Sequence, residues 1–340
     1  MRAPDRQRTR RRSGGCGANG APARGAALLL AMVILTLVAT LAAGMVWQQW
    51  RSVQVEAAER ARAQAAWILT GGLDWSRLIL REDALTGRAT SLAEPWATPL
   101  AETRLSTFLA VDGDNNSDSG PEVFLSGAMR DAQSRYNLRN LLDSTGKVNP
   151  AELKVLQRLC ASADVASGVA GKIADGLQAA FVASVGGKSV GATSAADAPL
   201  LPRTLAQLSW FGLDATTLTR LAPYVDLLPQ PTPVNLNTAP REVLAAVIEG
   251  LDLGSAERLL QARQRKAYAS LADAKNDLPP GTVLDETRVG VLSRYFEIDG
   301  RLRLEDRVLE ERSLVERRGN RGAEVVAIQR ARVNLQPEAP

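Results

Sequence analysis

The longest apolar segment of the chain covers residues 26–50, which contain no charged side chain. About 20 apolar residues are enough to span the hydrocarbon core of a bilayer, so this segment predicts a transmembrane helix. After it, apolar residues recur at three- and four-residue steps and charged residues lie off that stripe, as in an amphipathic helix. The stripe consists of Trp47, Trp50, Val53, Ala57, Ala61, Ala65, Ile68, Gly72, Trp75 and Ile79. One continuous helix over residues 26–81, about 80 Å long, is therefore predicted.

The middle of the chain changes from turn-rich to helical. Residues 82–128 are rich in turn formers, and short strands are predicted at residues 107–111 and 122–126. Residues 136–275 have mostly helical periodicity. A stretch rich in Ala, Gly and Ser at residues 161–198 interrupts it, and we expect the second half of that stretch to be a mobile loop.

The pattern after Tyr295 is alternation of apolar and polar residues. The apolar positions are Phe296, Ile298, Leu302, Leu304, Val325 and Ala327, with a turn at residues 319–322. This pattern predicts an antiparallel meander. We therefore predict an α+β protein in which a mostly helical domain interrupts an antiparallel sheet. Its expected segments are a leader (1–25), the long transmembrane and amphipathic helix (26–81), the first part of the head (82–135), the inserted helical domain (136–282) and the C-terminal meander of the head (283–340).

The positive charge of the chain is concentrated at its N-terminus. Residues 1–25 hold seven arginines and one aspartate, and the remaining residues hold 34 Lys and Arg against 36 Asp and Glu. Basic segments stay on the cytoplasmic side of a membrane, so we expect the leader to be cytoplasmic and the bulk of the chain periplasmic, on a single-pass inner-membrane anchor. The overall basic balance is thus a topology signal and does not indicate a nucleic-acid partner.

The composition argues against several kinds of chemistry. Histidine is absent, which removes the commonest general base and the usual zinc ligand, so we do not expect an enzyme. Of the two cysteines, Cys16 lies in the leader. Cys160 would be alone after removal of the leader, and we expect it to fill a helix interior.

The junction between leader and apolar run admits several interpretations. A conventional signal peptide would have a shorter apolar core, although Ala42-Ala43-Gly44 resembles a cleavage site. A lipoprotein signal does not fit, because Cys16 lacks a preceding apolar stretch. A plain membrane anchor remains an alternative. We favour a prepilin-type leader, a basic segment that ends in glycine and is cut after Gly25 so that the apolar run is kept.

Three segments carry a resemblance to a known family. Residues 24–33 (RGAALLLAMV), 129–138 (MRDAQSRYNL) and 234–239 (VNLNTA) resemble the K-type minor pseudopilins of the bacterial type II secretion system. The resemblance implies a pilin-like head with an inserted domain of SAM-like or helix-hairpin-helix-like helices. It also implies cleavage after Gly25 by the prepilin peptidase, methylation of Ala26, and a non-enzymatic place at the tip of the periplasmic pseudopilus beside the I- and J-type minor pseudopilins.

Leu30 bears on the position in the filament. Most pilin-like subunits have a glutamate at the fifth mature position, which pairs with the terminal ammonium group of a neighbour. An unpaired carboxylate in lipid is costly, so an apolar residue at this position suits a subunit that caps or initiates. The alternative is that Leu30 is an ordinary apolar residue of a membrane helix.

The helix stripe also predicts a packing surface for assembly. Its central members are Trp50, Ala57, Ala61, Ala65 and Ile68. We expect a charge at Ala61 or Ala65 to prevent assembly without unfolding the head.

A loop in the head has the residue types of a calcium site. Asp112, Asp114, Asn116 and Asp118 place oxygen donors at alternate positions, as calcium prefers. The alternative is a solvated Asp/Asn turn. Calcium is the only cofactor that the sequence indicates.

Residues 234–278 resemble a helix-hairpin-helix module, whose amides can bind a DNA phosphate. Six basic and six acidic residues lie between positions 232 and 282, so the segment lacks the positive charge that supplies most nonspecific DNA affinity. We therefore expect no nucleic acid and a structural use of the motif. A membrane-anchored DNA receptor is the alternative function.

Overall fold

The computed structural model describes residues 23–105, 122–185, 199–304, 307–319 and 322–333. The chain divides into two compact units, Met1–Gln64 and Ala65–Pro340. The predicted strand at residues 107–111 and the predicted calcium loop lie outside the described residues, as does most of the second half of the Ala-, Gly- and Ser-rich stretch.

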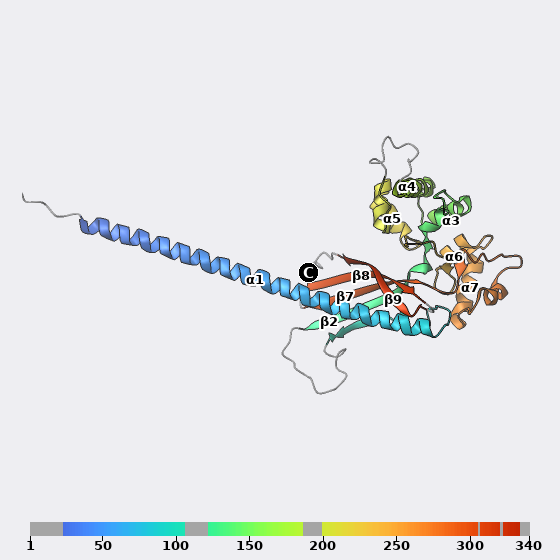
Figure 1. The fold of residues 1–340 in the computed structure, drawn as a ribbon, viewed down its shortest axis with the longest axis horizontal. Helices are drawn as coiled ribbons and strands as arrows, with labels where there is room; N and C mark the ends of the chain where they lie inside the picture. The colour runs from blue at the N-terminus through green and yellow to red at the C-terminus, as the bar shows by residue number, and fades with distance from the viewer. Residues whose placement is uncertain (1–22, 106–121, 186–198, 305–306, 320–321, 334–340) are drawn as a thin grey trace, which may run out of the picture. The chain divides into compact units, whose positions relative to one another are not determined.

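The first element is α1, a helix that spans Ala23–Leu85 (Figure 1). It confirms the long helix predicted from the apolar run and the stripe that follows it. From Gly25 onward α1 is long and apolar enough to cross a membrane. In its apolar part the hydroxyls of Thr36 and Thr40 donate to the carbonyls of Val33 and Leu37, both at 2.9 Å. These polar groups are therefore satisfied inside the helix, as lipid requires.

The second unit contains a five-stranded sheet in the order β1-β2-β7-β8-β9. Its strands are β1 (Leu100–Arg104), β2 (Val123–Asp131), β7 (Tyr295–Leu304), β8 (Arg307–Arg318) and β9 (Glu324–Val333). All four strand pairs are antiparallel. The predicted meander is confirmed in β7 to β9, and the strand predicted at residues 122–126 is the first part of β2. The short edge strand β1 was not predicted.

The C-terminal part of α1 packs on this sheet and completes the unit that we call the head. Leu73 and Leu80 are buried with Phe296 of β7. Trp96, in the short helix η1 (Pro95–Ala97), is fully buried and meets the Phe296 ring edge-on, with 5.2 Å between the ring centroids. A second cluster joins Ala65 and Leu69 of α1 to the sheet. The head core therefore uses residues from both ends of the chain.

Between β2 and β7 lies a helical segment, residues 132–294, that we call the insertion. Its α-helices are α3 (Pro150–Ser162), α4 (Gly168–Ser184), α5 (Ala215–Leu221), α6 (Arg241–Val247), α7 (Leu253–Arg265) and α8 (Leu271–Ala274). Short 3-10 helices complete it: η2 (Ala132–Ser134), η3 (Leu138–Leu141), η5 (Leu205–Phe211) and η6 (Lys275–Asp277). Most of its buried side chains form one cluster that contains no residue of the sheet. The insertion thus has its own core, and the predicted α+β class is confirmed.

The insertion consists of two helical groups, α3 to α5 and α6 to α8 (Figure 1). In the first group β3 (Tyr136–Asn137) pairs in parallel with β4 (Val225–Asp226). In the second β5 (Val234–Asn235) pairs in parallel with β6 (Val289–Gly290). In each group, this pair of short strands joins the segment where the chain enters the group to the segment where it leaves.

The two groups begin with the same local geometry. The Asn137 side chain accepts a hydrogen bond from the amide of Arg139, and the Asn235 side chain accepts one from the amide of Asn237. Both are Asx turns, in which a side chain takes the place of a backbone acceptor. Asn149 then caps α3 by accepting from Ala151 N at 3.0 Å, with Pro150 in the first turn.

Candidate functional site

The junction between head and insertion contains a network of buried polar side chains, among them Asp131, Gln133 and Asn235. The chain leaves the sheet at Asp131 and returns at Tyr295, and Asp131 pairs with Phe296 across β2 and β7. Two segments that carry the family resemblance, residues 129–138 and 234–239, meet here. The sequence shows no reason for them to be neighbours, since about 100 residues separate them.

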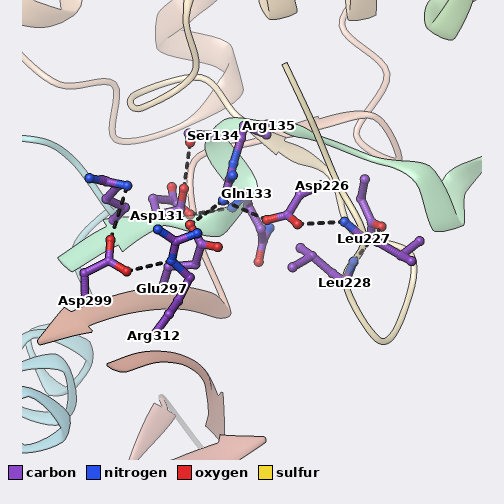
Figure 2. Close-up of polar contacts among 12 residues, drawn as sticks. Asp131, Gln133, Ser134, Arg135, Asp226, Leu227, Leu228, Glu297, Asp299 and Arg312 are labelled. Carbon is purple, nitrogen blue, oxygen red and sulfur yellow. Dashed lines mark hydrogen bonds and ion pairs between the residues drawn. The ribbon is translucent and has the colours of Figure 1, made fainter. Parts of the chain in front are cut away.

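Asp131 is the centre of this junction and is 3 % exposed. One carboxylate oxygen accepts from the amide of Gln133 at 2.8 Å. The other accepts from Asn235 Nδ2 at 2.9 Å, from Thr238 Oγ1 at 2.5 Å and from Ser293 Oγ at 2.6 Å. Figure 2 shows Asp131 beside Gln133 and near the charged residues Arg135 and Glu297. Four donors from three segments of the chain thus converge on one buried carboxylate.

Burial raises the pKa of the Asp131 carboxyl group, and the hydrogen bonds from Ser293, Thr238, Gln133 and Asn235 oppose that rise. None of the four donors carries a positive charge. The four hydrogen bonds therefore stabilise a buried negative charge that has no cation among its hydrogen-bond partners.

Two further side chains bind the same segments together. Gln133 donates through Nε2 to the carbonyl of Pro233 at 3.0 Å and accepts from the amide of Arg294 at 2.6 Å. Asn235 Nδ2 also donates to the carbonyl of Thr90, in the segment after α1, at 3.1 Å. The start of the second helical group is therefore fixed to both ends of the head.

An ion-pair cluster lies next to this network. The Arg135 guanidinium contacts Glu297 of β7 at 2.6 Å and Asp226 of β4 at 2.8 Å, and all three side chains are mostly buried. Burial lowers the pKa of Arg135, but the charges of Asp226 and Glu297 outweigh it and leave that pKa raised. Asp299 accepts from Arg312 at 2.7 Å on the neighbouring strand (Figure 2). The first helical group is thus bound to the sheet as well.

The sequence indicates the junction only through the family resemblance of its two segments. Its local pattern gives no role to Asp131, Gln133, Asn235 or Ser293. The Asn-Leu-Asn-Thr order at residues 235–238 is typical of an Asx turn before a helix, and that signal could have indicated a turn. Nothing in the sequence indicates that its partner is Asp131.

The head also has an apolar hollow of about 360 Å³ beside α1. Its walls include Leu69, Leu73, Ile79, Pro95, Pro99 and Met129. Gly127 and Gly300 face each other on β2 and β7 at its floor. A Cβ atom at Gly127 would lie 2.8 Å from the carbonyl oxygen of Asp299, so no larger residue fits without a shift of the strands.

The residues predicted as an assembly surface on α1 differ in their environments. Trp50 and Ala57 are exposed, and Ala61 and Ile68 are half-buried. Ala65 is 7 % exposed and belongs to a cluster with Leu69, Leu125 and Leu302. Ala65 is therefore part of the head core, and the expectation that a charge there spares the head is corrected.

The predicted processing site and the tip-specific position lie at the start of α1. Gly25, Ala26 and Leu30 are all exposed, Leu30 to 62 %. The predicted calcium ligands Asp112, Asp114, Asn116 and Asp118 lie outside the described residues. Among the described residues no group of three or more His, Cys, Asp or Glu side chains could hold a metal ion.

The geometry of the helix-hairpin-helix segment explains why it does not suit DNA. Gly250 has a φ of 77° and makes the turn into α7. The Asp252 side chain accepts from the amide of Ser255 at 2.6 Å, so a carboxylate already occupies the place that a phosphate would take. Arg263 donates to the carbonyls of Leu236 and Ala239 and is thus used within the fold.

Together, the long N-terminal helix and the antiparallel sheet packed on its C-terminal part define a pilin-like fold. Family models of type II secretion system protein K match residues 134–230 and 234–291. These matches and the fold identify the chain as a minor pseudopilin of the type II secretion system that is similar to protein K of that machinery.

Similar proteins cover most of the chain. Type II secretion system protein K of Pseudomonas aeruginosa is 27 % identical over 300 residues, which are 83 % of this chain and 85 % of that protein. The protein of the same name from Pectobacterium carotovorum is 28 % identical over 325 residues, 88 % of this chain and 94 % of that protein. These alignments are longer than the two segments that the family models match, so the similarity extends beyond the insertion.

A solved structure has the same fold. The crystal structure of the GspK–GspI–GspJ complex from the enterotoxigenic Escherichia coli type 2 secretion system matches with a TM-score of 0.63 and 21 % identity. The match covers 82 % of this chain and 99 % of that chain. The combination of pilin-like head and inserted helices therefore exists in an experimental structure.

Proposed function

We propose that this subunit caps or initiates the periplasmic pseudopilus and does so without catalysing a reaction. The observation that carries the proposal is the insertion of residues 132–294 between two adjacent strands of the head. Pilin-like filaments grow by stacking similar heads, and a helical body with its own core obstructs a further head. Steric obstruction requires no catalytic group, which agrees with the lack of histidine in the sequence.

The proposed partners are I- and J-type minor pseudopilins, together with the pseudopilus itself. A related chain is found with GspI and GspJ in a crystal structure, which supports this choice. The contact surface on α1 is the part of the predicted stripe that follows the uncharged run and is not fully buried in the head: Ala57, which is exposed, and Ala61 and Ile68, which are half-buried. Ala65 is excluded because the head already covers it.

The proposed location is the inner membrane, crossed once by α1, with the head in the periplasm. The prepilin peptidase cuts after Gly25, and Ala26 becomes the methylated N-terminus. Leu30 supports the tip position, because an apolar residue there needs no ammonium partner in the membrane. The mass of the N-terminal peptide of membrane-extracted protein tests this processing, and retention of Met1 would contradict it.

The structure allows a direct test of the capping role. Asp131 and Phe296 pair across β2 and β7, so residues 132–295 can be replaced by an Asn-Gly hairpin loop. The clusters that join α1 to the sheet contain no side chain of the insertion. The head is therefore expected to remain folded without it.

Cells in which the hairpin variant is the only copy of this protein should form longer pseudopili. The variant should still co-purify with the I-type partner. A matched control keeps the insertion and carries the exposed Asp74→Ala change. Pseudopili of unchanged length in cells with the hairpin variant would reject steric capping by the insertion. Loss of co-purification in the hairpin variant alone would instead place the contact in the insertion and reject the proposed partner surface on α1.

A further inference from the structure

The uncharged part of α1 ends in a pair of tryptophans. Trp47 and Trp50 are one helix turn apart, and their ring centroids are 5.6 Å apart with an interplanar angle of 35°. They are 65 % and 56 % exposed. Arg51, the next residue, is the first charged side chain after Arg24. Aromatic and charged groups thus follow each other where the apolar run stops.

Indole rings prefer the boundary between hydrocarbon and water. The ring body is apolar, whereas its N–H needs a hydrogen-bond partner that hydrocarbon does not provide. Tryptophan is accordingly enriched at the headgroup level of membranes. Two indoles on one helix face, followed by an arginine whose long stem lets its charge reach water, satisfy both requirements together.

The length of the apolar run does not by itself fix the depth of the helix. At about 1.5 Å per residue, residues 26–50 extend about 37 Å, which exceeds a hydrocarbon core of about 30 Å. The threonine hydroxyls within the run are satisfied by the helix backbone and do not favour any particular depth. Tilt and depth must therefore be set by residues at the ends of the run.

We propose that Trp47 and Trp50 form an interfacial anchor whose rings lie among the phospholipid headgroups on the head side of the membrane and fix the depth of α1. The anchor rests on the proposed function, since it requires α1 to cross a bilayer. The occupant of this surface is lipid, because the pair ends the membrane segment and the first fixed charge follows directly.

Quenching of tryptophan fluorescence by brominated phosphatidylcholine tests the anchor. The full chain is reconstituted alone into vesicles whose lipids carry bromine either near the headgroup or near the chain end. A W47F/W50F double variant removes the proposed anchor. A W67F/W210F double variant is the matched control, because it also removes two exposed tryptophans, 76 % and 49 % exposed, from outside the apolar run.

The wild-type chain and the control should be quenched more by the shallow bromine than by the deep one. The W47F/W50F variant should lose this quenching. Equal shallow quenching in both double variants, or stronger quenching by the deep bromine, would overturn the anchor. No partner protein is present, so a protein contact cannot produce the expected result.

Vesicle flotation separates this inference from the proposed function. If the wild-type chain does not float with the vesicles, the single-pass membrane location fails. If it floats but shows no shallow quenching that depends on Trp47 and Trp50, the location stands and the anchor is rejected.

Discussion

Replacing Asp131 by alanine removes the acceptor on which four hydrogen bonds of the junction converge. The donors are buried with it: Asn235 has no exposed surface, and Ser293 is 6 % exposed. Water cannot readily replace the lost carboxylate in so small a space. The variant therefore removes this acceptor from four donors of the insertion, of which Asn235 keeps the Thr90 carbonyl as another acceptor.

The expected cost follows from the number of donors. A buried donor left without an acceptor costs about 1–3 kcal/mol. The hydroxyls of Thr238 and Ser293 can rotate toward other acceptors, and removal of a buried charge recovers some desolvation free energy. We therefore expect Asp131→Ala to lower the free energy of unfolding by about 2–4 kcal/mol, less than the full sum.

An Asp131→Asn variant separates charge from hydrogen bonding. It keeps one oxygen as acceptor but places an amide nitrogen near the Asn235 amide, so a smaller loss of about 1–2 kcal/mol is expected. Because the pKa of Asp131 is raised, the native chain binds this proton more tightly than the unfolded chain. The contribution of Asp131 to stability thus falls as pH rises from the ordinary value of 3.8 through the folded pKa. This fall should be absent in the asparagine variant.

Urea unfolding of the full chain in detergent measures these differences. Two probes follow the two parts: fluorescence of the buried Trp96 for the head, and thiol labelling of Cys160 for the insertion. Cys160 is a free cysteine whose pKa burial raises to about 11, so it should react slowly until the insertion unfolds. Asp74→Ala, at an exposed ion pair with Arg77, is the control and should change stability by less than about 0.5 kcal/mol. The proposed role of Asp131 is rejected if Asp131→Ala behaves like this control.

Three further predictions concern the head and its predicted sites. Gly127→Ala should destabilise the head by about 1–3 kcal/mol in the same urea assay, because its Cβ would press on the Asp299 carbonyl; unchanged stability would mean that the strands shift freely. Ala65→Asp should lower the melting temperature of the head, because it buries a charge. Ala61→Asp should leave that melting temperature unchanged and reduce co-purification with partner pseudopilins. A lower melting temperature for Ala61→Asp than for Ala65→Asp would contradict the packing described. Calorimetric titration of the full chain with calcium should give binding heat that Asp114→Ala abolishes, and an absence of heat in the unaltered chain would retire the calcium site.

Local sequence patterns predicted the helices and strands in which apolar and polar residues recur at a regular spacing. The uncharged run at residues 26–50 and the stripe that continues it predicted α1, because a helix places every third or fourth residue on one face. Alternation at Phe296, Ile298 and Leu302 predicted β7, because successive side chains of a strand point to opposite faces. The edge strand β1 was missed, since Leu100–Arg104 is short and mostly solvent-facing and shows no clear alternation.

The junction depended on the tertiary structure. Asp131 and Asn235 are 104 positions apart, and their hydrogen bond exists because the fold packs β5 against η2, which directly follows Asp131. Likewise, Ala65 and Ile68 belong to one sequence stripe, yet Ala65 is buried in a core cluster and Ile68 only partly buried against it. The sequence by itself determined which segments are helical, extended or apolar enough to cross a membrane, because those properties depend on neighbours along the chain. Only the tertiary structure decided which polar side chains are partners and which helix face is already covered, because both depend on strand order and packing across long sequence separations.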